Sequence, residues 1–436
     1  MNSYGDIKNS DVAWIGSIPS EWGIRVLFQV VEQVKNKNKD LQETNLLSLS
    51  YGKIKRKDIN NPEGLLPESF DGYNIIESDD IVLRLTDLQN DHTSLRVGQA
   101  LERGIITSAY TTMRPTDQIN PRFLYYVLHS YDLIKGFYGM GSGVRQGLNY
   151  DEVKMIKIPY PSISDQKTIA DYLDKQCGHI DEIIEEAKNV IDEHVRWKAS
   201  MIEEVVTKGL NSNVSMKNSD VEWIEKIPSE WSVSRLKTLF SFGKGLPITK
   251  DDLVDAGIPV ISYGQIHAKF NSGTSIRDDL IRYVPDSYLS SNPDSLVHIG
   301  DFLIADTSED RTGCGNAVYV DKDMQLFAGY HTIILNSISN NDNKFLAYLF
   351  KSDAWRSQIR TRVSGVKLFS ITKKILNSVS VIIPPEEEQK KIVEYLDVKC
   401  SLIDGIIDTK NRLIEDLEVY KRSLIYETVT GKRKVV

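Results

Sequence analysis

Basic, amide and aromatic side chains gather in short segments of this chain, several of them hinged by glycine. The densest basic stretch runs from Tyr51 to Lys57, and the glycine-rich loop from Gly141 to Gly147 carries an arginine and a glutamine. Lysine and arginine suit phosphates and guanine edges, whereas glutamine and asparagine suit adenine. We therefore predict DNA contacts in the first half of the chain from Lys53, Lys55, Arg56, Lys57, Arg145 and Gln146.

A second set of such residues lies in the second half of the chain. Four of them alternate along one segment, and two sit at glycine-bearing basic tips, Arg311-Thr312-Gly313 and Gly365-Val366-Lys367. The alternative for each residue is ordinary surface solubility, but we expect at least one loop in each half to touch DNA. The candidates in this half are Tyr263, Gln265, His267, Lys269, Arg311 and Lys367.

Patterns that would carry covalent or cofactor chemistry are missing. The sequence has no G-x-x-x-x-G-K-[ST] phosphate loop and no Asn-Pro-Pro-aromatic tetrad to hold a flipped adenine. Cys177, Cys314 and Cys400 stand alone without a C-x-x-C pair, so we expect small core residues rather than zinc ligands. We expect no catalytic, cofactor-binding or metal site in this chain and interpret it as a binding protein.

The composition indicates an ordinary globular protein with two to four domains. The chain has 436 residues, of which 41% are hydrophobic and 26% charged. Its apolar runs are too short for a membrane span, its N-terminus resembles no signal peptide, and three cysteines make no disulfide framework. We therefore expect a cytoplasmic protein without a membrane partner. The net charge of −8 is concentrated in segments 164–206 and 387–430, which leaves room for a basic face elsewhere.

Those two acidic segments are predicted to be long helices. Each follows a proline-bearing start and carries apolar residues at spacings of three, four or seven, with polar residues elsewhere. A helix of this length extends roughly 60 Å at 1.5 Å per residue. So thin an apolar stripe does not stabilise a lone helix, so the simplest partner for each helix is the other one. The segments that precede the helices are predicted to be mixed α and β.

The whole unit of globular segment and helix occurs twice. The offset between matching landmarks grows from 209 to 223 residues through the globular segments and then stays constant through the helices. The two globular copies therefore differ from each other by insertions, whereas the two helices stay in register. We predict recognition domains at 1–160 and 210–383 and long helices at 161–209 and 384–436. The duplicated motifs are Trp14-Ile15 … Ile18-Pro19-Ser20-Glu21-Trp22 with Trp223-Ile224 … Ile227-Pro228-Ser229-Glu230-Trp231, and Gln166-Lys167 … Tyr172-Leu173-Asp174 with Gln389-Lys390 … Tyr395-Leu396-Asp397.

Two ordered copies of these motifs around divergent globular segments resemble the specificity subunit, HsdS, of type I restriction–modification systems. The resemblance covers essentially the whole chain. It implies an α+β fold with two target-recognition domains joined by two long antiparallel helices, in a pseudo-twofold repeat. Antiparallel packing would place Cys177 and Cys400 roughly 20 Å or more apart, since both lie early in their helices.

The resemblance also implies function. Each recognition domain would read one half of a split, asymmetric site in double-stranded DNA. Two methyltransferase subunits (HsdM), which methylate adenine, would dock on the shared frame, and up to two restriction subunits (HsdR) would join them. S-adenosylmethionine, ATP and Mg would be bound by these partners. The frame residues expected to support docking are Trp14, Trp22, Tyr172, Trp223, Trp231 and Tyr395.

Two other interpretations remain open at this point. One is an enzyme, a fused methyltransferase or nuclease with unrecognised motifs. The other is a two-lobed coiled-coil scaffold whose lobes bind ligands unrelated to DNA. If instead the chain is a specificity subunit, the helices act as a ruler, and changing their length would change the spacing between half-sites.

Overall fold

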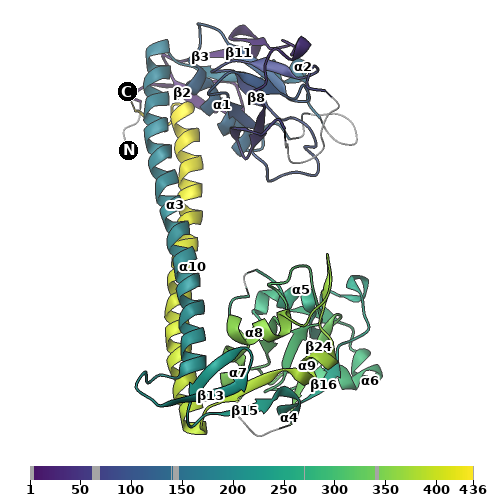
Figure 1. Ribbon diagram of the computed structural model, residues 1–436. Coiled ribbons are helices and arrows are strands. Elements are labelled where there is room, and N and C mark those ends of the chain that lie inside the picture. The colour runs from purple at the N-terminus through teal and green to yellow at the C-terminus, as the bar shows by residue number, and fades with distance from the viewer. Residues whose placement is uncertain are drawn as a thin grey trace. The chain divides into compact units, whose positions relative to one another are not determined.

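Two long helices organise the fold (Figure 1). In the computed structural model, which describes residues 4–60, 69–138, 140, 147–269, 271–338 and 343–435, α3 spans Ile163–Lys208 and α10 spans Glu386–Val429. The hydroxyl of Ser162 accepts a hydrogen bond from the Asp165 backbone N–H at 3.1 Å, and three glutamates occupy the first turn of α10. Both features stabilise helix N-termini. The predicted pair of long helices is confirmed.

The chain forms two compact units. Unit 1 comprises Met1–Lys188 and Lys410–Val436, and unit 2 comprises Asn189–Thr409. Each unit therefore contains one globular part, the beginning of the helix that follows it, and the end of the other helix. The predicted domain boundaries, which assign each helix to a separate segment, stay a prediction.

Within each unit the two helices run antiparallel. In unit 2, Lys198 Nζ lies 2.7 Å from a carboxylate oxygen of Asp404, and in unit 1 Lys421 Nζ lies 2.5 Å from one of Asp181. Late residues of one helix thus pair with earlier residues of the other. Cys177 belongs to the apolar core of unit 1 and Cys400 to that of unit 2, as antiparallel packing requires.

Unit 1 is built on a four-stranded antiparallel sheet with the order β4-β11-β8-β9. A second group of strands pairs β5 with β6 and β10 with β7, and a parallel bridge joins Leu46 to Ile105 at the start of β5 and in β10. The bounds are β4 Val31–Gln33, β5 Leu47–Ser50, β6 Lys53–Arg56, β7 Asn74–Ile76, β8 Ile81–Leu83, β9 Val97–Gln99, β10 Gly104–Ile106, β11 Thr111–Pro115, and, among the helices, α1 Pro121–Leu133 and α2 Tyr150–Val153.

Unit 2 repeats this topology. Its first sheet has the order β16-β24-β20-β22 and its second the order β18-β17-β23-β19, in which β17 and β23 are parallel. The bounds are β16 Phe240–Lys244, β17 Ile258–Ile261, β18 Arg282–Val284, β19 Leu296–Val297, β20 Phe302–Ala305, β22 Ala317–Tyr319, β23 Leu326–Ala328 and β24 Thr332–Ser337, with α4 Leu236–Leu239, α6 Tyr288–Ser291, α7 Lys344–Leu349, α8 Asp353–Arg360 and α9 Lys373–Ser378. The predicted α+β fold with an internal repeat is confirmed.

Two further pairs of strands recur beside the helices. In unit 1, β1 (Ile7–Asn9) pairs with β2 (Ser17–Pro19), and β3 (Gly23–Val26) pairs with β12 (Lys157–Tyr160). In unit 2, β13 (Met216–Val221) pairs with β14 (Ile224–Pro228), and β15 (Ser232–Arg235) pairs with β26 (Ser380–Ile383). These pairs close each globular part at the point where its own helix begins. In the part of the chain that the structure describes, none of the helices combines the length and apolarity of a membrane span.

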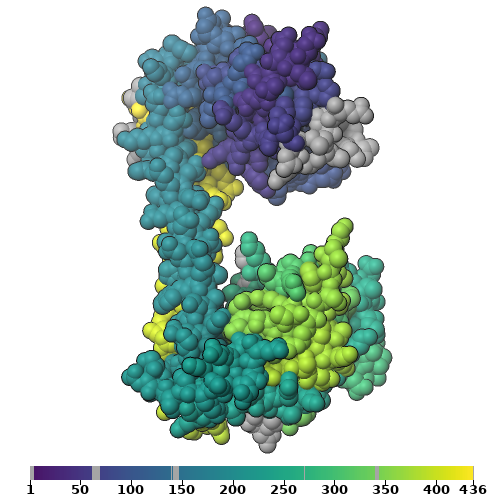
Figure 2. Space-filling model, viewed as in Figure 1, coloured from purple at the N-terminus to yellow at the C-terminus, as the bar shows by residue number. Residues whose placement is uncertain are grey.

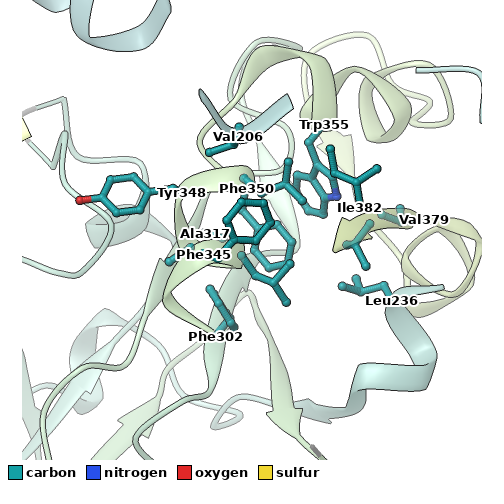
Figure 3. Packing of buried hydrophobic residues seen from close by; sticks show 14 of the residues in the cluster. Val206, Leu236, Phe302, Ala317, Phe345, Tyr348, Phe350, Trp355, Val379 and Ile382 are labelled. Atoms are coloured by element: carbon teal, nitrogen blue, oxygen red, sulfur yellow. The ribbon is translucent and has the colours of Figure 1, made fainter. Parts of the chain in front are cut away.

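Each apolar core includes the end of the helix that arrives from the other copy. In unit 2, Val206 of α3 belongs to the cluster around Phe302, Phe350 and Trp355, whose last two rings stack at 4.1 Å between centroids (Figure 3). In unit 1, Leu424 and other residues of α10 belong to the corresponding cluster around Trp22. Because burying aliphatic and aromatic side chains is the main source of stability, each globular part depends on both helices.

Candidate nucleic-acid interface

Three segments meet beyond the ends of the strands in unit 1. They are the turn after β5 with strand β6, the loop between β8 and β9, and residues 147–148. We call residues 51–57, 84–96 and 147–148 loop cluster 1. A methyl group on Gly52 would lie 3.1 Å from the side chain of Leu95. The Leu148 N–H donates to the Leu85 carbonyl at 2.9 Å. Packing and hydrogen bonding therefore hold the three segments together.

Unit 2 brings together the corresponding three segments. Loop cluster 2 comprises residues 263–269, with α5 (Tyr263–Ile266), the loop 306–316, with β21 (Thr307–Ser308), and residues 364–371, with β25 (Phe369–Ser370). Strands β21 and β25 pair, and the Ile371 N–H donates to the Asp306 carbonyl at 2.7 Å, which matches the Leu148 bond in unit 1. The two clusters thus share a scaffold but differ in local structure.

The basic stretch of unit 1 lies on an exposed hairpin. Lys53, Lys55 and Arg56 lie on β6 and Lys57 follows it, and all four side chains are exposed. Arg56 forms an ion pair with Glu102, and this hydrogen bond holds the pKa of Glu102 below its usual value. The stretch therefore supplies a set of cations within loop cluster 1. The other two candidates in this half, Arg145 and Gln146, lie outside the described residues.

The loop 84–96 of loop cluster 1, which the sequence analysis did not identify, is held in place by side-chain hydrogen bonds. The buried Arg96 donates to the Thr86 carbonyl at 2.8 Å and to the Tyr138 hydroxyl at 3.3 Å. Lys135 donates to the His92 carbonyl, and the exposed His92 ring stacks on Tyr138 at 5.1 Å between centroids. The cluster therefore displays an imidazole in a fixed position. These residues follow no periodic pattern, so no signal in the sequence singles them out.

The segment from Tyr263 to Lys269, along which four candidates alternate, is not extended. Residues 263–266 form the one-turn helix α5, because Ser262 and Gln265 make a capping box. The side-chain oxygen Oε1 of Gln265 accepts from the Ser262 N–H at 2.9 Å, so this end of the amide is occupied by the backbone. The Tyr263 ring packs edge-on against Tyr330 at 5.6 Å, while Lys269 is exposed.

The two basic tips of unit 2 lie on different parts of loop cluster 2. Arg311 is exposed and donates to the Arg360 carbonyl at 3.1 Å, which places it beside the end of α8. Lys367 lies in the segment around residue 365, a narrow lime-green finger that projects from the unit (Figure 2), where the neighbouring Val366 is 94% exposed. The first tip is held by a hydrogen bond, whereas the second is highly exposed.

Two arginines missed by the sequence analysis lie beside loop cluster 2. Arg356 and Arg360 lie one turn apart on α8, and both donate to the Thr312 carbonyl, at 2.5 and 3.0 Å. Burial, reinforced by the charge of Arg360, lowers the pKa of Arg356 to about 10, so it stays protonated at neutral pH. The Arg-x-x-x-Arg spacing in an amphipathic helix was the signal that could have identified them.

A hollow of about 580 Å³ opens between α5, the loop 306–316 and α8. His267 lies in its wall, with Nε2 at 2.9 Å from the Thr307 carbonyl and Nδ1 at 2.9 Å from the Asn316 amide nitrogen. The Asp310 carboxylate is held by the Thr312 hydroxyl and the Gly313 N–H, which lower its pKa. Over the described ranges, no group of three or more His, Cys, Asp or Glu side chains is placed to hold a metal ion.

The tryptophans of the duplicated frame lie within their own units. Trp22 and Trp231 are fully buried, and Trp231 Nε1 donates to Glu388 at 2.9 Å. Trp14 Nε1 donates to the Lys157 carbonyl at 3.1 Å, and Trp223 is half-buried. The buried pair can support docking only by holding the frame together. Of the six frame candidates, those that present helix surface are Tyr172, half-buried on α3, and Tyr395, 37% exposed on α10.

The ends of the helices lock onto the leading segments. Gly431, just after α10, has φ of +72°, and a methyl group there would lie 2.3 Å from the Pro19 ring. Gly209, just after α3, has φ of +81°, and a methyl group there would lie 2.7 Å from Glu388 and 3.4 Å from Trp231. Only glycine adopts this conformation without strain, so the end of each helix is fitted to the leading segment of the unit it enters.

A duplicated scaffold with two divergent loop clusters defines a class of two-part recognition proteins, and sequence comparison places the chain within it. The family model for the type I restriction modification DNA specificity domain matches residues 19–193 and 228–419, so the chain belongs to this family of specificity subunits.

Individual relatives extend over most of the chain. It is 22% identical over 424 residues to the type I restriction enzyme MjaVIII specificity subunit of Methanocaldococcus jannaschii, covering 96% of this chain and 94% of that one. It is 26% identical over 442 residues to the putative MjaX specificity subunit of the same organism, covering 97% and 96%. A solved chain from work on complex assembly and conformational transition of the type I R-M system matches with a TM-score of 0.66 and 16% identity, covering 94% of this chain and 98% of that chain, which establishes the shared fold.

Proposed function

We propose that the two loop clusters read the two halves of a split, asymmetric site in double-stranded DNA. The observation that carries this proposal is a shared scaffold with divergent clusters: the same strand order ends in a basic hairpin in unit 1 and in α5 with its arginine-lined hollow in unit 2. Equivalent scaffolds favour equivalent placement on DNA, whereas different side chains favour different bases. Lysine and arginine supply the phosphate contacts, and amide and imidazole groups supply base contacts.

In this proposal the chain itself catalyses no reaction. Two HsdM subunits dock on the duplicated frame and methylate adenine, and up to two HsdR subunits join in the full complex. S-adenosylmethionine, ATP and Mg are bound by these partners, and the complex works on host DNA in the cytoplasm. The duplicated leading segments and helix ends support this assignment, because two equivalent frames suit two copies of one partner.

A selection experiment tests the proposal. The complex of this chain with the methyltransferase subunit of its own system is incubated with a library of random DNA duplexes, and bound duplexes are amplified and sequenced. We expect two short conserved blocks separated by an unconserved spacer of fixed length. A single continuous block, or recovery without any conserved sequence, would contradict the proposal. The methyltransferase subunit alone serves as the control and should enrich no such pair of blocks.

A further inference from the structure

The hollow of loop cluster 2 contains a chain of hydrogen bonds that ends on an uncommitted amide. The Thr307 carbonyl, the His267 ring and the Asn316 side chain follow one another, with both links at 2.9 Å. All three residues belong to unit 2, and His267 and Asn316 line the hollow. The order of donors and acceptors along this chain determines what Asn316 presents to a ligand.

The Thr307 carbonyl fixes the first link. A carbonyl oxygen only accepts hydrogen bonds, so His267 Nε2 carries a hydrogen and donates it. In the neutral imidazole Nδ1 is then an acceptor, and it faces the nitrogen of the Asn316 amide. One amide N–H of Asn316 therefore donates to His267, and the orientation of the amide is set by the ring.

The remaining groups of Asn316 are free to bind a ligand. Within the described part of the chain, Asn316 Oδ1 and the second amide hydrogen have no hydrogen-bond partner, and the residue is partly exposed. Its backbone is fixed on both sides: its N–H donates to the Gly313 carbonyl at 3.0 Å, and its carbonyl accepts from the Ala305 N–H at 3.2 Å. The amide thus offers an acceptor and a donor side by side from a fixed position.

The surroundings of this amide suit a nucleic acid. Arg356 and Arg360 of α8 also line the hollow and supply positive charge. Tyr263 of α5 adds an aromatic ring to the lining. Arginine beside an aromatic ring and an oriented amide matches the composition of base-reading surfaces, in which cations contact phosphate and the amide contacts a base edge.

We propose that Asn316 reads an adenine in the half-site of unit 2, and that His267 is the positioning residue that orients the Asn316 amide. The inference rests on the proposed function and makes it specific for one base. Adenine presents N7 as an acceptor and its N6 amino group as a donor in the major groove, the complement of the free N–H and Oδ1 of Asn316. In the major groove no other base presents that pair on its own edge.

Four variants test the inference in a host that carries the complete methyltransferase complex. Asn316→Ala and Asn316→Ser remove the amide. His267→Phe keeps a ring but cannot accept a hydrogen bond, whereas His267→Gln offers an acceptor to Asn316 and a donor to Thr307. Asp286→Asn, an exposed change in unit 2 outside loop cluster 2 and its hollow, is the matched control. The readout is the motif of N6-methyladenine across the host genome, obtained by single-molecule sequencing.

We expect the asparagine variants to relax one base pair of one half-site, with discrimination at that position reduced about 10- to 100-fold and the other half-site unchanged. His267→Phe should relax the same position. His267→Gln should retain the original base preference, and the control Asp286→Asn should leave the whole motif unchanged. A purely structural role for His267 would lower methylation at every site instead of changing one base. If an asparagine variant fails to fold and loses all methylation, the His267→Phe and His267→Gln pair decides.

The failures are distinguishable. A split motif that stays unchanged in both asparagine variants overturns the adenine contact and leaves the proposed function intact. A motif that relaxes in the asparagine variants but in neither histidine variant overturns the positioning role alone. If the unaltered chain directs no split motif, the proposed function falls and the inference with it.

Discussion

Lys198 and Asp404 form an ion pair in unit 2, with Nζ 2.7 Å from the carboxylate, and Lys421 and Asp181 form its repeat in unit 1. The lysines are 223 residues apart in the sequence, and so are the aspartates. The offset that the motifs establish in the sequence thus reappears as a contact between antiparallel helices. The two pairs differ in exposure, since the side chain of Lys198 is 8% exposed and that of Lys421 is 24% exposed.

This difference predicts unequal effects of removing the two carboxylates. Asp404→Ala leaves the ammonium of Lys198 buried and unpaired, so it should lower the free energy of local opening by about 1–3 kcal/mol. Asp181→Ala should cost less than about 1 kcal/mol, because water can solvate Lys421. Hydrogen–deuterium exchange of the helix segments around residues 198 and 421 measures both, and equal losses of protection would contradict the expectation.

The glycines that follow the two helices predict an order of stability among glycine-to-alanine variants. Gly431→Ala forces a side chain into positive φ and against the rigid Pro19 ring, so it should destabilise unit 1 by more than about 2 kcal/mol. Gly209→Ala should cost less, because the Glu388 carboxylate can rotate away. Gly178→Ala is the control: it lies on exposed helix with nothing within 4 Å and should stabilise by up to about 1 kcal/mol. Limited proteolysis rates of the three variants should follow this order.

The buried His129 predicts a pH dependence of unit 1. Burial, reinforced by the charge of Lys421, lowers the pKa of His129 to about 4, whereas the unfolded chain takes up this proton near pH 6.5. Stability contributed by the neutral ring is therefore present at pH 7 and falls as the pH falls toward 4, with about 2 kcal/mol lost by pH 5. His129→Phe, which keeps the ring stacked on Tyr125, should lack this loss.

Denaturant unfolding at pH 7 and pH 5 tests the difference between the two proteins. Asp132, whose pKa burial raises to about 6, contributes with the opposite sign, because the folded state then binds the proton more tightly. It is present in both proteins, so subtracting their stabilities isolates His129. The same pH dependence in the variant would show that His129 is not the responsible group.

Removing lysines from the exposed hairpin of unit 1 is predicted to weaken the salt dependence of DNA binding. If Lys53 and Lys55 contact phosphates, replacing both with alanine should reduce the slope of log affinity against log salt by about 0.9 for each lost contact. The measurement is binding of the complex to a selected duplex at several salt concentrations. Lys8→Ala with Lys157→Ala is the control, since both lysines are exposed on strands outside loop cluster 1. Equal slopes in both double variants would exclude the hairpin from the interface.

The frame of this protein could be predicted because it is periodic and duplicated. An apolar stripe at helical spacing, without proline and repeated in register, has few structural solutions, and the antiparallel pair is one of them. The contribution of each helix end to the core of the other copy follows from that pairing. Both features depend on patterns that extend over tens of residues.

The loop clusters could not be predicted because single side chains decide them. Ser50-Tyr51-Gly52-Lys53-Ile54 and Ser262-Tyr263-Gly264-Gln265-Ile266 match in sequence, yet the first turns into a hairpin and the second starts α5. Gln265 accepts a hydrogen bond from Ser262, whereas the lysine at the equivalent position has no acceptor and cannot close a capping box. Arg356, Arg360 and Asn316 are brought together only by the tertiary fold, so no local pattern marks them as a set.

A map of N6-methyladenine in a host that expresses this chain with its methyltransferase partner, compared with the same host lacking this chain, shows directly whether each loop cluster reads half a site. Two loop clusters that each read half a site predict one bipartite motif, with two short specified blocks and a spacer of constant length between them. An uninterrupted motif, or methylation that does not depend on this chain, would contradict the account.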